Sequence, residues 1–133
     1  MKKVIVVLLS FVVLFFAVNL NIENVKAEYS NDSVVVEKIR DLGGVNGLYS
    51  VDWRDRGGRV SFYVTVYNGQ IINASEVGYA FWGATVNSAE LKIDNPKQAT
   101  YYFDIKNIAD YAGVTEYLRV IIDSNNKIVA TFE

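Results

Sequence analysis

The sequence predicts an all-β fold in which two antiparallel sheets pack face to face. From residue 47 onward, apolar and polar residues alternate in short segments, the pattern of half-buried strands. Gly, Asn and Asp, the usual turn residues, separate these segments at intervals of roughly ten residues. The chain has no cysteine, so burial alone has to stabilise the fold. The 106 residues left when 27 of the 133 are set aside suffice for one core.

Residues 1–27 carry the three parts of a signal peptide. A basic start precedes an apolar run over 4–18, and a polar exit ends at Ala27, which predicts cleavage before Glu28. A membrane anchor is the alternative, but the run lies near the short limit of the roughly 17–25 residues that span a bilayer. We therefore expect a secreted or cell-wall-associated bacterial protein without stable membrane insertion after cleavage.

Residues 28–46 lie between the signal peptide and the β domain at 47–133, and they fit two structures. Asp32 or Ser33 would cap a short N-terminal helix that ends at Gly43. The triple valine at 34–36 suits an extra edge strand instead. The helix is slightly favoured because alternation fails here while apolar residues recur at helical spacing, at Val35, Val36, Ile39 and Leu42.

Seven strands are expected in the β domain. The clearest covers 59–67, where Val60, Phe62 and Val64 share one face and alternate with polar residues and tyrosines. It follows a hairpin turn at 55–58 and ends at Asn68-Gly69, a pair that tolerates positive φ. The expected strands are 47–54, 59–67, 77–86, 89–93, 99–105, 115–123 and 127–132.

Three stretches resemble immunoglobulin-like and fibronectin type III domains. Residues 108–120 are similar to the corner in which a tyrosine, here Tyr117, caps a turn with its hydroxyl on the backbone near Asp110. The segment 60–69 resembles the second strand, and Trp82 falls where that fold often buries a tryptophan. The resemblance covers about 47–132. It implies a seven-stranded antiparallel immunoglobulin-like β-sandwich and no particular activity.

Catalytic signatures are missing from the whole chain. Histidine and cysteine are absent, which removes the usual general base, the thiol nucleophile and the common metal ligands. Asp52 and Asp55 flank Trp53 and offer the two carboxylates of a glycosidase. We favour a structural interpretation, with Trp53 in the core, Asp52 solvated and Asp55 at a turn. No enzyme activity, catalytic residue or cofactor is therefore predicted.

A calcium site is only partly supported. The segment 123–127 begins like a loop of oxygen ligands, but Lys127 stands where a further ligand is needed. Four aspartates could still converge at one end of the sandwich, which leaves a structural calcium ion open while no metal ligand is predicted. They are Asp94, Asp104, Asp110 and Asp123.

Aromatic residues are abundant, and strand parity sorts them into core and surface. Tyr63, Tyr67 and Tyr102 fall on the polar side of their strands. In the immunoglobulin-like arrangement their two strands are neighbours, so the three rings would form one exposed ligand-binding face. Alternatively, they only pack across the strands. The expected core aromatics are Trp53, Phe62, Tyr101, Phe103 and one of Phe81 and Trp82.

Charge narrows the class of partner. The chain carries a net charge of −2, and loss of 1–27, with three lysines and one glutamate, leaves −4. An acidic protein of this kind lacks the basic surface that binds nucleic acid. The leading hypothesis is a small secreted non-enzymatic binding module for an extracellular glycan or protein. The alternative is a secreted toxin, bacteriocin-like effector or inhibitor, because 82–86 and 99–102 faintly resemble the end of lactococcin-like bacteriocins.

Overall fold

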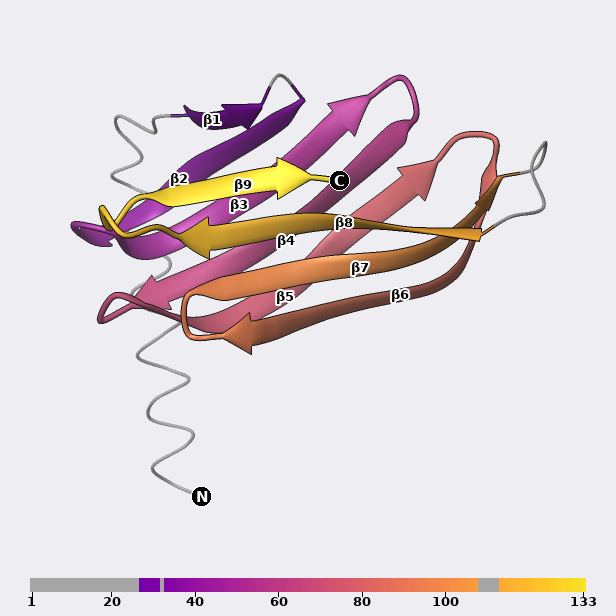
Figure 1. The fold of residues 1–133 in the computed structure, drawn as a ribbon. Coiled ribbons are helices and arrows are strands. Elements are labelled where there is room, and N and C mark those ends of the chain that lie inside the picture. The colour runs from indigo at the N-terminus through magenta and orange to yellow at the C-terminus, as the bar shows by residue number, and fades with distance from the viewer. Residues whose placement is uncertain (1–26, 32, 108–112) are drawn as a thin grey trace, which may run out of the picture.

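The computed structural model describes residues 27–31, 33–107 and 113–133, and these ranges contain nine strands and no helix (Figure 1). Residues 1–26 of the predicted signal peptide, 1–27, and the predicted corner residue Asp110 lie outside the described residues. The strands are β1 (Ala27–Asn31), β2 (Val34–Gly43), β3 (Asn46–Asp55), β4 (Gly58–Tyr67), β5 (Gln70–Phe81), β6 (Ala84–Asn95), β7 (Gln98–Asn107), β8 (Gly113–Ile122) and β9 (Ile128–Phe132).

The strands form two antiparallel sheets. Strands β1 to β5 pair in sequence order in the first sheet, and β6 to β9 pair in sequence order in the second. Figure 1 shows the second sheet lying over one face of the first, with β9 in front of β2 and β3. Contacts of β9 with β1 and β2 connect the layers on one side, and contacts of β5 with β6 connect them on the other. The two-sheet sandwich is thus confirmed.

The immunoglobulin-like strand order is not present. That order needs Greek-key connections, which place strands distant in sequence side by side. Here each strand pairs only with the preceding and following strands, and the chain changes sheets once, between β5 and β6. Tight turns such as those at 56–57 and 68–69 connect the strands, and a turn of two residues joins neighbouring strands only. The resemblance therefore holds for the two layers and not for their topology.

The N-terminal segment forms two strands, which contradicts the helix and confirms a strand at the triple valine, although β1 and not β2 is the edge strand of the sheet. Strand β2 pairs along its length with β3, with Val34 opposite Trp53 and Val36 opposite Val51. Val34 and Val36 are buried while Val35 between them is half-buried. β-Branched residues favour this pleated setting, and burial against the second sheet outweighs the helical spacing of the segment.

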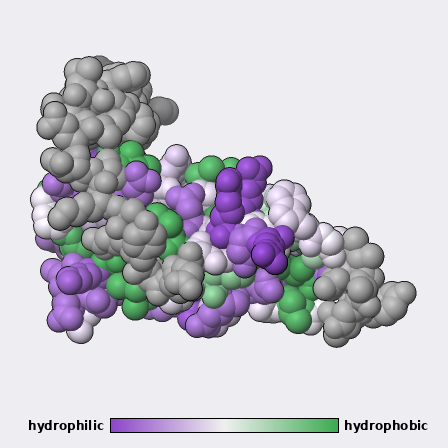
Figure 2. Space-filling view, turned by 90° about the horizontal axis from the view of Figure 1, so that it is seen from above, coloured by the Kyte–Doolittle hydropathy of each residue, from purple (hydrophilic) through white to green (hydrophobic). Residues whose placement is uncertain are grey.

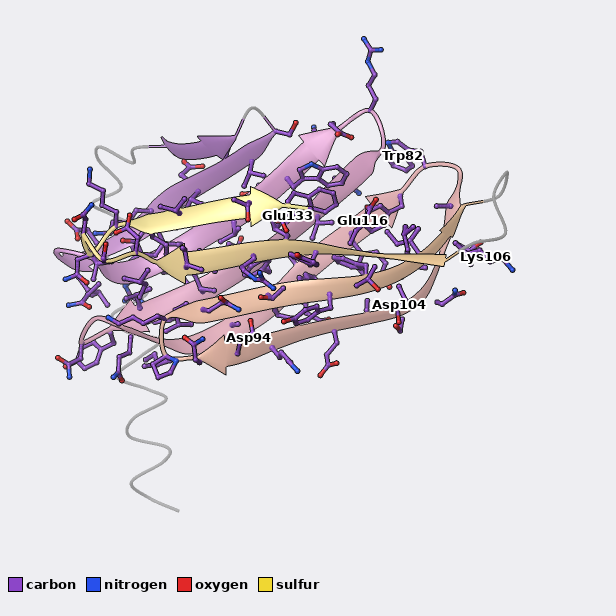
Figure 3. All side chains as sticks on the ribbon, viewed as in Figure 1. Trp82, Asp94, Asp104, Lys106, Glu116 and Glu133 are labelled. Atoms are coloured by element: carbon purple, nitrogen blue, oxygen red, sulfur yellow. The ribbon has the colours of Figure 1, made fainter. Side chains whose placement is uncertain are left out.

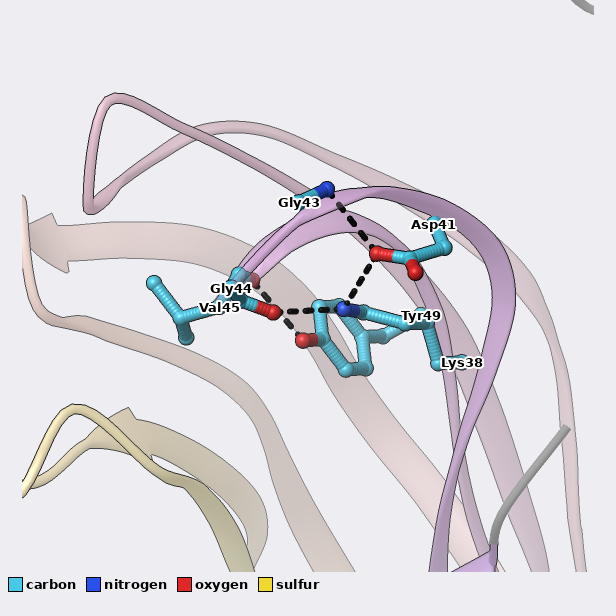
Figure 4. A network of polar contacts seen from close by, with 6 residues as sticks. All are labelled: Lys38, Asp41, Gly43, Gly44, Val45 and Tyr49. Atoms are coloured by element: carbon cyan, nitrogen blue, oxygen red, sulfur yellow. Dashed lines mark hydrogen bonds and ion pairs between the residues drawn. The ribbon is translucent and has the colours of Figure 1, made fainter. Parts of the chain in front are cut away.

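The turn that follows β2 is held by polar contacts (Figure 4). The Nζ atom of Lys38 donates to Asp41 at 2.9 Å and to the carbonyl of Gly44 at 2.6 Å. The Tyr49 hydroxyl donates to the carbonyl of Val45 at 2.8 Å. Gly43 has a φ of +100°, a conformation that favours glycine, so the residue once expected to end a helix instead turns a hairpin.

The predicted strand 77–86 is two strands separated by a turn. Trp82 and Gly83 connect β5 to β6, and Gly83 has a φ of +70°. This left-handed conformation breaks the strand, although the alternation in the sequence runs through 77–86 without interruption. Strand β5 also begins earlier than expected, and β6 takes in the predicted strand 89–93. Seven strands follow residue 45, as predicted, with different boundaries at β5 and β6.

The core lies between the two sheets and is rich in aromatic rings. Trp53 on β3 stacks on Phe132 of β9, with ring centroids 3.8 Å apart and planes 12° apart. Phe62 on β4 meets Tyr101 on β7 edge to face, at 6.0 Å. These contacts cross from one sheet to the other. Four predicted core aromatics are confirmed as buried, namely Trp53, Phe62, Tyr101 and Phe103.

Candidate functional site

The three predicted binding tyrosines do not gather on one face. Tyr63 and Tyr67 are 37% and 61% exposed on β4, so their predicted parity is confirmed. Tyr102 lies on β7, and β4 and β7 belong to different sheets. The predicted single aromatic face is therefore wrong, because it depended on the immunoglobulin-like order that would make these strands neighbours.

Tyr102 belongs to a polar network on the outer side of β6 and β7. Its hydroxyl donates to the carboxylate of Asp94 at 2.8 Å, and Thr100 donates to the same carboxylate at 2.5 Å. A third hydrogen bond comes from Gln98 at 3.1 Å. Burial opposes the charge of Asp94, but these hydrogen bonds, with the charge of Arg119, outweigh burial and lower the pKa of Asp94.

Tyr117 lies beside Tyr102 and does not form the predicted corner. Its hydroxyl donates to the carboxylate of Glu133 at 2.6 Å, and this hydrogen bond raises the pKa of Tyr117. The Arg119 guanidinium lies 4.5 Å from the centre of its ring. A corner tyrosine caps a turn between strands of a Greek key, and this meander of strands has no such crossing. The hydroxyls of Tyr102 and Tyr117 on the outer face of the second sheet are thus already hydrogen-bonded within the protein.

The carboxylates around Trp53 are also accounted for. Trp53 is in the core, as expected, and Asp55 accepts a hydrogen bond from the Gly57 amide at 2.5 Å in the predicted turn. Asp52 is half-buried rather than solvated, and the hydroxyls of Ser50 and Ser61 donate hydrogen bonds to its carboxylate. The side chain of Asp52 is therefore part of a small polar cluster on the outer face of the first sheet.

The predicted convergence of aspartates is not observed among the described residues. Asp104 accepts hydrogen bonds from Ser88 and Thr115, and Asp123 accepts them from backbone amides of its own turn. Asp94 is held by its own separate network. In the described ranges, no group of three or more potential ligands could hold a metal ion.

A pocket that sequence reasoning missed lies at the end of the sandwich where the β3–β4 and β5–β6 turns meet. It is a partly open hollow of about 290 Å³, close to the lower end of the range for small-molecule sites, roughly 300–1,000 Å³. Four aromatic side chains and two carboxylates are the groups in its lining that most define its chemistry. They are Trp53, Phe81, Trp82, Phe132, Asp55 and Glu116. Figure 3 labels Trp82 and Glu116 at this end of the molecule.

Trp82 is the exposed edge of this end pocket. It is 61% exposed, whereas the neighbouring Phe81 packs against the core, so Phe81 is the core residue of the two. The resemblance implied that Trp82 would be buried, and its exposure contradicts this expectation. The Trp82 amide donates to the carbonyl of Gly57 at 2.9 Å, which fastens the β5–β6 turn to the β3–β4 turn. Hydrophobic surface is visible at this end, on the right of Figure 2.

Glu116 sits on the inward side of β8. It pairs with Phe103, and Val114 pairs with Ile105, both of which are buried core residues. Paired residues in an antiparallel sheet lie on the same face, so Glu116 faces the interior at the open end of the sandwich. Burial, and then the negative charge of Asp55, raises the pKa of Glu116. Glu116 is spaced by two residues from Leu118 and by four from Val120, so strand parity in the sequence could have identified it as an inward residue.

We expect Glu116→Gln to stabilise the protein at neutral pH. A carboxyl whose pKa is raised in the folded state adds to the free energy of unfolding at acid pH. This contribution disappears as the pH rises through the folded pKa. The charged group is then a cost at neutral pH that glutamine removes. Because Glu116 is partly solvated, the gain should be below about 1 kcal/mol. Urea unfolding should show the gain at pH 7 and none at pH 3, whereas a loss at pH 7 would contradict the placement of Glu116.

Basic residues lie on the side of Trp82 that faces away from the end pocket. Arg54 and Arg59 are directly opposite each other on β3 and β4, and both side chains are exposed. With Asp55, Gly58 and Trp82 they line a more open hollow on the outer side of the first sheet. Like charges placed opposite each other destabilise a sheet. Trp82 therefore separates a basic surface from the acidic end pocket.

Comparisons with protein-family models, with curated proteins and with solved structures find no match to this chain. Within the described residues, no helix is long and apolar enough to cross a membrane.

Proposed function

We propose that this protein is a small secreted non-enzymatic binding module, and that the end pocket is its ligand site. The observation that carries the proposal is the exposed indole of Trp82 at the rim of an aromatic-lined pocket. A tryptophan gains little from exposure to water, and in interfaces it is among the residues that contribute most to affinity. Its target is an extracellular glycan or a protein surface, either of which presents groups that stack on aromatic rings.

The composition of the pocket supports binding. Trp53, Phe81 and Phe132 form its apolar lining, and their packing against the core makes the pocket preformed. Preformed sites lose less conformational entropy when a ligand binds. The outer faces of the sheets support the proposal less well, because Tyr102 and Asp52 are already engaged in hydrogen bonds within the protein.

The proposal is tested by Trp82→Ala, with Tyr67→Ala as its matched control. Both side chains are 61% exposed, but only Trp82 lines the end pocket. Retention on cell-wall fragments and on immobilised extracellular proteins should fall about 30-fold for Trp82→Ala, the effect of losing a hot-spot contact of ~2 kcal/mol. Tyr67→Ala should bind like the unmodified protein.

Both variants should keep their urea unfolding midpoints, because neither side chain is part of the buried core. Full retention by Trp82→Ala would overturn the end pocket as the ligand site. Loss of retention by Tyr67→Ala alone would place binding on the outer face of β4 instead.

A further inference from the structure

We propose that the end pocket selects a ligand that carries an organic ammonium group. This inference rests on the proposed function of the pocket and specifies the chemistry of its ligand. The group would lie among the aromatic rings, with its positive charge toward Asp55 and Glu116.

The charge of the lining is the first argument. Two of the residues that line the pocket are acidic, and none of them is Lys or Arg. A neutral sugar or a hydrophobic side chain would leave the half-buried carboxylate of Glu116 without a counter-charge, beside the exposed carboxylate of Asp55. A cation would neutralise them, and attraction between charges is stronger where water is partly excluded.

The direction of Glu116 is the second argument. Most inward positions of β8 hold apolar residues, as at Leu118 and Val120, and the sandwich needs no charge there. Within the described parts of the chain, Glu116 has neither a hydrogen-bond partner nor an ion-pair partner. An inward carboxylate without a partner is costly in the free protein, and a bound cation removes that cost.

The aromatic rings are the third argument, and they favour an organic cation over a metal ion. Ring faces attract ammonium groups through their negative quadrupole, and tryptophan does so best. Trp82, at the rim, is exposed enough to contact a ligand, and Phe81 and Trp53 lie deeper in the same lining. The volume of about 290 Å³ suits a head group rather than an extended ligand.

The surroundings of the pocket specify where the charge lies. Arg54 and Arg59, on the far side of Trp82, repel a cation and so direct it to the side of Glu116. The ammonium group has two possible sources, a quaternary head group of a small molecule or glycan and the lysine side chain of a protein.

The experiment compares ligands of the same shape that differ in charge, by titration followed through tryptophan fluorescence and NMR. Choline and 3,3-dimethylbutan-1-ol represent a quaternary head group and its neutral counterpart. Butylammonium and pentane represent a lysine side chain in the same way. We expect at least one ammonium compound to bind about tenfold more tightly than its neutral counterpart, and the preferred pair identifies the source of the group.

Variants separate the charge from the pocket itself. Glu116→Gln should reduce binding of the ammonium compound toward the level of the neutral one, with Asp55 keeping a smaller preference, and leave binding of the neutral one unchanged. Glu90→Gln is the matched control, because Glu90 is exposed and pairs with Tyr102 on the outer side of the same sheet. Trp82→Ala should weaken both members of the pair.

The outcomes distinguish this inference from the proposed function. Equal binding within each pair, unaffected by Glu116→Gln but weakened by Trp82→Ala, overturns the ammonium inference and supports the pocket as a site. Absence of binding by all four compounds also overturns the inference, and the retention assay with Trp82→Ala then decides the proposed function independently.

Discussion

Replacing Trp53 by alanine is expected to lower the free energy of unfolding by about 3–5 kcal/mol. Trp53 is only 5% exposed and stacks on Phe132, so it joins the edge strand of the second sheet to the middle of the first. It also contacts Phe81, at 5.9 Å between ring centroids. Alanine would leave a cavity between the layers that neither ring can fill. Urea unfolding measures the loss, which is a large part of the roughly 5–15 kcal/mol typical of domains.

Trp82→Ala is the control for this prediction because the chain has two tryptophans in opposite settings. Trp82 is exposed, and its amide hydrogen bond to Gly57 uses the backbone, so the variant keeps that bond. Its unfolding free energy should change by less than about 0.5 kcal/mol, as at other surface sites. Similar losses for both variants would mean that Trp82, and not only Trp53, packs in the core.

Strand parity was the most informative part of the sequence because it depends on local geometry. Alternation in a strand places every second residue on one face whatever the strand pairs with. The buried positions of Phe62, Tyr101 and Phe103 and the exposure of Tyr63 and Tyr67 were therefore predictable. The two layers followed as well, because several amphipathic strands must bury their apolar faces against one another.

Strand order was not predictable in the same way. Which strands become neighbours depends on the connections, and the alternation is the same for a meander and a Greek key. The error had a functional consequence, since the placement of Tyr102 beside Tyr63 needed the wrong order. The turn at Trp82-Gly83 was missed for a related reason: the residues on both sides of it alternate, so the pattern continues through the break.

The end pocket was hidden from sequence reasoning because its residues come from six strands and two turns. Trp53, Trp82, Glu116 and Phe132 are far apart in the chain, and only the folding of the meander brings them to one end. Each residue also had an ordinary local interpretation. Only Glu116 departs from its local pattern, as an acidic residue at an inward position of β8.

The second large effect is expected for Asp94→Asn. The carboxylate of Asp94 accepts hydrogen bonds from Thr100, Tyr102 and Gln98, and an asparagine amide cannot accept all of them. Thr100 is fully buried, so its hydroxyl cannot turn to water for a new partner. The loss at pH 7 should be about 1.5–3 kcal/mol, the range for hydrogen bonds to a charged group. Urea unfolding at pH 7 measures it.

The pH dependence of this loss follows from the lowered pKa of Asp94. A carboxyl with a lowered pKa in the folded state contributes stability above its unfolded pKa, and that contribution disappears as pH falls through the folded pKa. The difference between the protein and Asp94→Asn should therefore be large at pH 7 and shrink on acidification. Asp104→Asn, on the neighbouring strand β7, is the control because Asp104 is exposed, and it should change stability by less than about 0.5 kcal/mol. A difference for Asp94→Asn that stays constant down to strongly acid pH would show that packing of the side chain, and not its charge, stabilises this face.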